Sequence, residues 1–123
     1  MRSPATGSFD EASERVQVDD LICSREMPEG LCVLRLAGEV DLSTVHVIRD
    51  AAADSIRAHG PTLRLDLSSV MFMDCAGVAA LLAISRCVRA RGGTLDIEAS
   101  RPVSKVIRLA RVERVLHVTT EVA

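Results

Sequence analysis

Hydrophobic and polar positions near the start of the chain indicate two β-strands, at residues 14 to 25 and 31 to 38. Between them lies Met27-Pro28-Glu29-Gly30, and its proline and glycine are typical of a turn. We therefore predict that the chain opens with an antiparallel hairpin. Further on, leucines alternate with charged residues from Leu63 to Leu67, which indicates a short strand.

Three helices are predicted from hydrophobic residues at helical spacing. The first follows Asp41-Leu42-Ser43-Thr44, which are suited to capping a helix, and it ends at His59-Gly60-Pro61. The second runs from Gly77 to about Arg91, and the third runs from Pro102 to Arg111.

Two more strands, at Thr94 to Glu98 and at the edge from Val115 to Val118, complete the predicted pattern. Together these elements predict an α/β fold: a mixed sheet of four to five strands with helices mainly on one face. The length of 123 residues suits one domain, which we place at residues 13 to 123. Residues 1 to 12, rich in Ser, Ala, Gly and acidic residues, are predicted to form a disordered N-terminal tail.

Composition narrows the classes of partner. Hydrophobic residues make up 48% of the chain but aromatic residues only 2%, so the core must be aliphatic and bases would find few stacking platforms. A net charge of -2 also gives no strong field for attracting nucleic acid. No apolar run approaches the ~20 residues that span a bilayer. We expect a cytoplasmic protein that binds neither nucleic acid nor membranes.

The cysteines and histidines of the sequence do not have the spacing of a metal site. None of the four cysteines forms a C-x-x-C pair, and the histidines, His46, His59 and His117, are scattered. We predict no metal site and no cofactor. Cys23 and Cys32 are predicted to be core residues on neighbouring strands.

Several separated motifs resemble the STAS family of anti-sigma factor antagonists. The segment from Asp66 to Gly77, DLSSVMFMDCAG, is similar to the family signature. Leu36 to Asp41 resembles its L-x-G-E-L-D element, and Gly92-Gly93-Thr94-Leu95 resembles its G-G-x-L strand entry. With Pro102-Val103 and the closing segment, the resemblance spans roughly residues 14 to 118. The family usually has a glycine after the third helix, where this chain has Arg111, so we expect this helix to end without the left-handed cap.

This resemblance implies a regulator that binds an anti-sigma factor of the serine-kinase type and thereby releases a sigma factor. The residues that it implies for partner binding are Asp41, Ser43, Asp74, Cys75, Ala76 and Gly77. In the family, the residue before the glycine of D-S-[ST]-G is phosphorylated, which blocks the complex. The matching residue here is Ala76, which has no hydroxyl. We therefore expect a binding surface that phosphorylation at this position does not control.

Other triggers and roles remain open at this stage. Ser43, Thr44, Ser68 and Ser69 are alternative phospho-acceptors, expected in loops near the turn. The alternatives for Cys75, at a helix N-terminus, are a redox-active thiol and an inert packed residue.

Two acidic residues have two compatible roles each. Asp41 and Asp74 are predicted to cap helices as well as to contact a partner.

The wider function also has alternatives. No sequence motif ties a histidine to Cys75, so we do not expect an enzyme. The principal alternative is a STAS scaffold, or a redox or ligand sensor subunit, that does not bind an anti-sigma factor. A basic C-terminal half that contacts an acidic partner is a minor hypothesis, and a homodimer is an open question.

Overall fold

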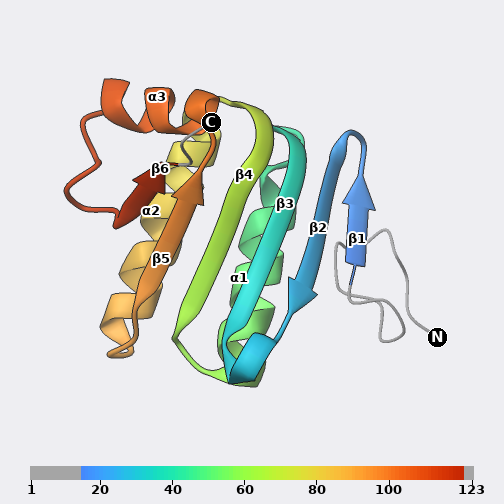
Figure 1. The fold of residues 1–123 in the computed structure, drawn as a ribbon, viewed down its shortest axis with the longest axis vertical. Helices are drawn as coiled ribbons and strands as arrows, with labels where there is room; N and C mark the ends of the chain where they lie inside the picture. The colour runs from blue at the N-terminus through green and yellow to red at the C-terminus, as the bar shows by residue number, and fades with distance from the viewer. Residues whose placement is uncertain (1–14, 121–123) are drawn as a thin grey trace.

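A computed structural model of the chain describes residues 15 to 120. These residues form a six-stranded sheet in the order β1-β2-β3-β4-β5-β6 with three α-helices (Figure 1). The tail predicted at residues 1 to 12 lies outside the described residues. The elements are β1 (Arg15–Val18), β2 (Leu21–Glu26), a 3-10 turn (Pro28–Gly30), β3 (Cys32–Val40), α1 (Val45–His59), β4 (Leu63–Met73), α2 (Cys75–Ala90), β5 (Leu95–Ala99), α3 (Arg101–Leu109) and β6 (Val118–Thr120).

The sheet is mixed, as predicted. Strands β1, β2 and β3 are antiparallel neighbours, and β3, β4, β5 and β6 run parallel. Helices α1 and α2 cover one face of the sheet, and α3 lies across the end where the parallel strands finish (Figure 1). Within residues 15 to 120, the opposite face carries no helix. This arrangement brings the loops after β3 and β4 to the same end of the sheet.

The strand count exceeds the predicted four to five because the first predicted strand is itself a hairpin. The chain turns at Asp19-Asp20, and Val18 pairs with Leu21. Asp19 takes the left-handed conformation, with φ of 51°. Aspartate tolerates that conformation better than most residues, so a tight turn forms here without glycine or proline.

Two other strands differ from the sequence prediction by three or more residues at one boundary. Strand β4 is longer than the predicted short strand and extends to Met73. The predicted edge strand exists, but it starts at Val118, because Val112 to Leu116 forms a turn held by the Val115 and Leu116 N–H groups donating to the Val112 carbonyl. Leu116 closes the core there and is buried.

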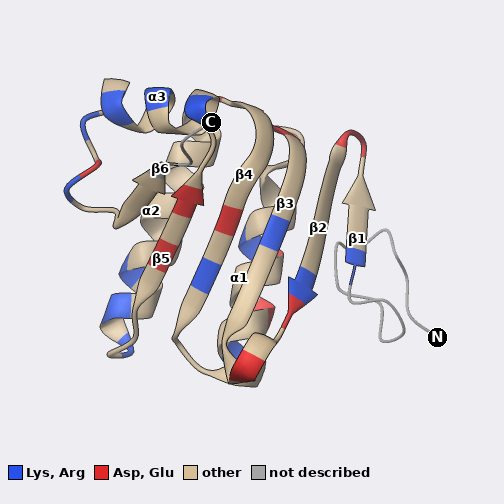
Figure 2. Ribbon diagram, in the orientation of Figure 1, with Lys and Arg blue, Asp and Glu red and all other residues tan. Residues whose placement is uncertain are grey.

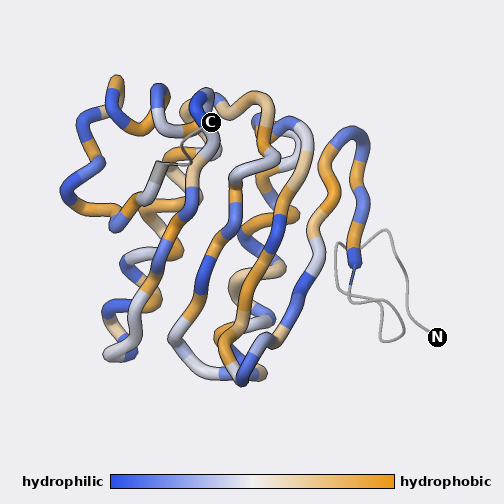
Figure 3. Tube along the Cα trace, in the orientation of Figure 1, coloured by the Kyte–Doolittle hydropathy of each residue, from blue (hydrophilic) through white to orange (hydrophobic). Residues whose placement is uncertain are grey.

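The core fills the space between the sheet and the helices, and its larger members are aliphatic, as predicted. Hydrophobic and hydrophilic residues alternate along the central strands (Figure 3), and one set points toward α1 and α2. Cys23 and Cys32 are both buried, which confirms the prediction for them. Burial raises the pKa of the Cys23 thiol to about 12. The largest fully buried side chains are Leu21, Leu34, Leu36, Ile48, Leu63, Leu65, Leu67, Met73, Leu81, Ile97, Ile107 and Leu116.

Helix α3 ends in the left-handed turn that its sequence did not favour. Arg111 has φ of 58°, and its N–H donates to the Arg108 carbonyl at 3.0 Å. The Val112 N–H reaches back to the Ile107 carbonyl at 3.3 Å, which closes the helix in the usual left-handed way. The prediction of a different helix end was therefore wrong, because an arginine takes the place of the expected glycine.

None of the helices in the described part of the chain is both long enough and apolar enough to cross a membrane.

Candidate functional site

The turn between β4 and α2 is built around the carboxylate of Asp74. Its Oδ1 accepts hydrogen bonds from the N–H groups of Ala76 at 2.9 Å and Gly77 at 3.3 Å. Asp74 has extended backbone angles, as an N-cap residue requires. The predicted capping role is therefore confirmed, and the carboxylate is committed to the start of α2.

The residues of this turn differ in what they present to solvent. Cys75 is exposed and Ala76 is half-buried against the edge of the core. Cys75 is therefore not packed in the core, contrary to one of its two alternatives. All four cysteines are free thiols. Cys75 and Ala76 form the accessible part of the turn.

Gly77 lies on the inner side of the same turn and is buried. A Cβ at this position would lie 2.5 Å from Met73 Cγ and 3.1 Å from Val40 Cγ1. The glycine thus lets α2 start directly against the ends of β3 and β4. We assign it a packing role behind the surface rather than a contact on it.

The loop after β3 is ordered by Asp41. Its Oδ1 accepts from the Ser43 hydroxyl at 2.7 Å, the Ser43 N–H at 2.9 Å and the Thr44 N–H at 3.1 Å. The hydrogen bond from the Ser43 hydroxyl is the main cause that lowers the pKa of Asp41, so this carboxyl stays charged at neutral pH. The prediction that Asp41 caps the first helix was wrong, because α1 starts after Thr44 and Asp41 caps the turn that precedes it.

The loops after β3 and β4 form one surface. Val40 pairs with Met73 at the ends of the two strands, and the Asp74 N–H donates to the Val40 carbonyl at 3.1 Å. The structure therefore brings Asp41 and Ser43 to the same end of the sheet as Asp74, Cys75 and Ala76. We call these five residues the loop surface.

Exposed hydrophobic residues beside the loop surface were not predicted. Leu42 is 79% exposed, Met71 73% and Phe72 48%. Phe72 pairs with Glu39 one step below the end of the strands, so it lies next to both loops. One signal for Leu42 was visible in the sequence: it is an apolar residue within a polar capping segment, outside the helical spacing of α1. Side chains of this kind commonly mark protein contacts.

Charges of opposite sign flank the loop surface (Figure 2). On one side, a hollow of about 470 Å³ is lined by Asp19, Asp20, Glu39, Asp41, Ser43 and Thr44. On the other side, α3 exposes Arg101, Lys105 and Arg108. The Ser100 hydroxyl donates to the Val70 carbonyl at 2.6 Å and fixes the start of α3 beside β4.

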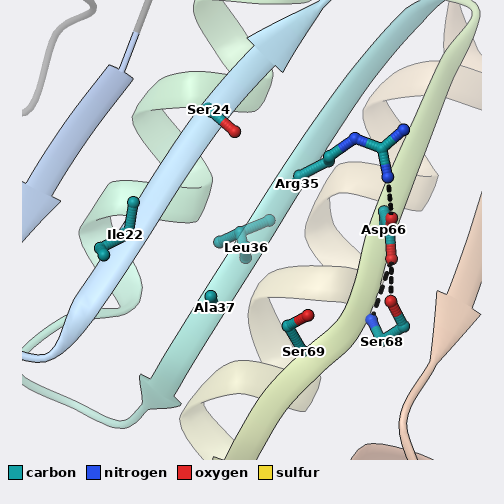
Figure 4. A pocket seen from close by; sticks show the side chains of 8 residues that line it. All are labelled: Ile22, Ser24, Arg35, Leu36, Ala37, Asp66, Ser68 and Ser69. Carbon is teal, nitrogen blue, oxygen red and sulfur yellow. Dashed lines mark hydrogen bonds and ion pairs between the residues drawn. The ribbon is translucent and has the colours of Figure 1, made fainter.

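Ser68 and Ser69 were predicted to lie in loops near the turn, and this prediction was wrong. They belong to β4. Arg35 pairs with Asp66 and Ala37 pairs with Ser69, so β4 has one more residue than β3 between these pairs and forms a bulge. Both serines line a hollow of about 280 Å³ on the open face of the sheet (Figure 4). The Ser68 hydroxyl donates to Asp66 Oδ1 at 2.6 Å.

Asp66 anchors this bulge. Burial raises the pKa of its carboxyl, but the hydrogen bonds from Ser68 and the guanidinium of Arg35 outweigh burial and lower the pKa overall. Arg35 also binds Glu26 at 3.0 Å, and the Glu26 hydrogen bond is the main cause that raises the pKa of Arg35. The charges of Arg35, Glu26 and Asp66 are paired with one another, so we assign these side chains a structural role.

The other two candidate acceptors lie in the loop after β3 and are already engaged. Thr44 is buried, and its hydroxyl donates to the Glu39 carbonyl at 3.0 Å. Ser43 is exposed but its hydroxyl donates to Asp41. A phosphate on either residue would have to break these bonds.

The described residues hold no cluster of metal-binding side chains. In residues 15 to 120, no hydrogen bond connects Cys75 with a histidine: His46 and His59 lie in α1, and His117 is exposed before β6.

Comparison with known proteins gives a family and a fold. The family model described as "Mlab, STAS domain" matches residues 23–119. An anti-sigma factor antagonist from Mycobacterium paratuberculosis is 23% identical, with a TM-score of 0.73 over 84% of this chain and 89% of that one. The anti-sigma factor antagonist SpoIIAA in its unphosphorylated form is 25% identical, with a TM-score of 0.68 over 81% of this chain and 88% of that one.

No curated protein matches the sequence. The family model nevertheless covers most of the chain, and the fold is similar to that of the two structures above. The chain therefore belongs to the STAS-domain family.

Proposed function

We propose that this protein is a cytoplasmic anti-sigma factor antagonist that binds a serine-kinase-type anti-sigma factor and releases a sigma factor. The observation that carries the proposal is the loop surface, in which Asp41, Ser43, Asp74, Cys75 and Ala76 lie together at the end of β3 and β4. The similar structures are of anti-sigma factor antagonists, which supports this general role.

The physical character of the surface suits a protein partner. Leu42 stands between Asp41 and Ser43, and Phe72 pairs with Glu39, so exposed apolar side chains and polar groups lie next to each other here. Protein interfaces combine an apolar centre with a polar rim in the same way. Association would bury these side chains, which gives the hydrophobic part of the affinity.

Ala76 makes the binding independent of phosphorylation at this residue. The N–H groups at the start of α2 and the positive end of its dipole would favour a phosphate here, but alanine has no oxygen to carry one. The surface thus keeps the small, neutral shape of an unmodified turn. Asp74 occupies two of the N–H groups instead.

The test is a pull-down of candidate anti-sigma kinases with the purified chain, with and without ATP. We expect an ATP-independent complex and no phosphate on the chain by mass spectrometry. Ala76→Glu should weaken the complex by at least about tenfold, because it places a carboxylate on the contact surface. Ala90→Glu is the matched control: Ala90 is exposed on the same helix, about 21 Å further along at ~1.5 Å per residue.

Two outcomes would contradict the proposal. Equal affinity of folded Ala76→Glu and wild type would move the interface away from the turn. A phosphate on any residue of the wild-type chain that dissociates the complex would show that binding is controlled after all.

A redox-sensing STAS subunit that binds no anti-sigma factor is the second candidate, and the exposure of Cys75 favours it. A thiol at a helix N-terminus is accessible to oxidants. The same pull-down separates the two roles: a sensor subunit would bind none of the anti-sigma kinases, and Cys75→Ala would abolish its response to peroxide.

A further inference from the structure

The charges beside the loop surface are separated by sign. The acidic flank consists of Asp19, Asp20, Glu39 and Asp41, which line one hollow. The basic flank consists of Arg101, Lys105 and Arg108 on the exposed side of α3. Figure 2 shows the two flanks on opposite sides of the end of β4, at the same end of the sheet. Each flank could therefore meet the other flank of a second molecule.

No side chain of residues 15 to 120 neutralises either flank through an ion pair. The ion pairs of the described residues lie on the open face of the sheet, between β2 and α1, or within α1. They are Arg35 with Glu26 and Asp66, Arg64 with Glu98, Arg25 with Asp54, and Arg57 with Asp54. Within residues 15 to 120, no ion pair includes a member of the acidic or the basic flank. Four negative and three positive charges thus remain available to a partner.

Because the two flanks lie on either side of the end of β4, a twofold axis between them would set the acidic flank of one copy against the basic flank of another. We infer that two copies of this chain associate about such an axis, with the acidic flank of each copy against α3 of the other. The two contacts are equivalent, so the pairing closes as a dimer and leaves no free end. Leu42 and Phe72 lie near the axis and would be covered.

The dimer would cover Cys75 and Ala76, which are the accessible part of the turn. If the proposed function is correct, dimer formation and partner binding exclude one another. Dimer formation would then control partner binding without a hydroxyl at residue 76, because the partner binds only the monomer. This masking rests on the proposed function, whereas the dimer does not.

The first test measures oligomeric state by sedimentation equilibrium. We expect a monomer–dimer equilibrium whose dissociation constant rises at least about tenfold between 50 and 500 mM NaCl, because salt screens charges that remain partly solvated. A monomer at every concentration and salt overturns the proposal. Species larger than a dimer also overturn it, because they indicate open head-to-tail pairing.

Charge exchange makes the test specific. Lys105→Glu/Arg108→Glu leaves one positive and two negative charges on α3, so both flanks of this variant are acidic. Asp19→Asn/Asp20→Lys/Glu39→Lys leaves two positive charges and one negative charge on the other flank, so both flanks of that variant are basic; all five substituted side chains are exposed. Each variant alone should be monomeric, and an equimolar mixture should form a heterodimer, because both contacts are then restored. A mixture that stays monomeric contradicts the proposed pairing. Arg86→Glu/Arg91→Glu changes the net charge as much as Lys105→Glu/Arg108→Glu does, at the far end of α2, and should leave the dimer intact.

The covered turn can be tested without any partner through its thiol. Cys75 and Cys87 are both exposed, and Cys23 and Cys32 are buried. At low salt, raising the protein concentration through the dimer range should slow maleimide labelling of Cys75 several-fold and leave Cys87 unchanged. Equal rates at Cys75 in monomer and dimer would show that the axis lies elsewhere. Because no anti-sigma factor is used, a failed pull-down and a failed dimer test remain distinguishable.

Discussion

Gly77 lies so close to Met73 that a Cβ on the glycine would stand 2.5 Å from Met73 Cγ. Met73 is buried, and Val40 Cγ1 lies 3.1 Å from the same point. In an ordinary helix, replacing glycine with alanine stabilises the fold. Here we expect Gly77→Ala to lower the free energy of unfolding by about 1–3 kcal/mol, because the added methyl group overpacks the core. Urea unfolding measures this change.

A double-mutant cycle identifies the cause. In a Met73→Ala background the clash with the side chain of residue 73 is absent, so Gly77→Ala should destabilise the protein less. Equal effects in both backgrounds would show that Met73 is not the obstacle.

A second prediction concerns the cap at Asp74. Asp74→Ala removes the acceptor for the N–H groups of Ala76 and Gly77, and should lower stability by about 0.5–2 kcal/mol. Asp74→Ser keeps an acceptor and should lose less. Asp96→Ala, an exposed aspartate on β5, is the control for removal of a charge. Identical unfolding of Asp74→Ala and wild type would contradict the capping role.

Ala76→Ser should create a phosphorylation site where the wild type has none. If the partner is a serine kinase, incubation of this variant with partner and ATP should add one phosphate and dissociate the complex. Ala90→Ser, at the exposed far end of α2, should stay unmodified. Intact-mass spectrometry gives the result, and an unmodified Ala76→Ser chain bound to an active kinase would rule out this form of the switch.

Arg111→Gly should stabilise the protein. The arginine has φ of 58°, and a residue with a side chain loses about 1–2 kcal/mol of stability in this conformation. Glycine removes this loss, but its greater freedom in the unfolded chain cancels part of the gain. We expect a gain of about 0.5–1 kcal/mol in the free energy of unfolding. Arg114→Gly, at the exposed residue three positions further on, should bring no such gain.

Stability should fall at alkaline pH because of Cys23. Burial raises the pKa of its thiol to about 12, whereas a cysteine in the unfolded chain has a pKa of about 8.5. Below pH 8.5 both states keep the proton, and between these values only the folded state keeps it. The free energy of unfolding should therefore decrease by up to about 1.4 kcal/mol per pH unit above pH 8.5. Cys23→Ala should show a smaller decrease between pH 8 and 10, and parallel pH profiles would contradict the assignment.

Local patterns in the sequence predicted most of the element types. The apolar spacing of α1 and α2 and the alternation from Leu63 to Leu67 reflect burial on one face, which any strand or helix shows along its own length. The extra hairpin escaped detection because its turn, Asp19-Asp20, contains no glycine or proline. The length of β4 was hidden by Ser68 and Ser69, polar residues that a bulge accommodates.

The candidate site could be predicted only in part. The cap at Asp74 depends on residues two and three positions away, so it is visible in the sequence. Asp41 lies beside this turn because β3 and β4 are parallel neighbours. Local sequence patterns do not reveal that pairing, and only the fold or a family resemblance does. The exposure of Leu42 and Phe72 likewise follows from where the strands end.

The hydrogen bond from the Asp74 N–H to the Val40 carbonyl has a thermodynamic consequence. It connects the two loops where they leave β3 and β4. The side chains of Asp41 and Asp74 hold the backbone within each loop by hydrogen bonds. A partner that docks on them would meet a preorganised shape and lose little conformational entropy in ordering it. Association should then proceed as rigid-body docking, with free and bound loops that superimpose closely.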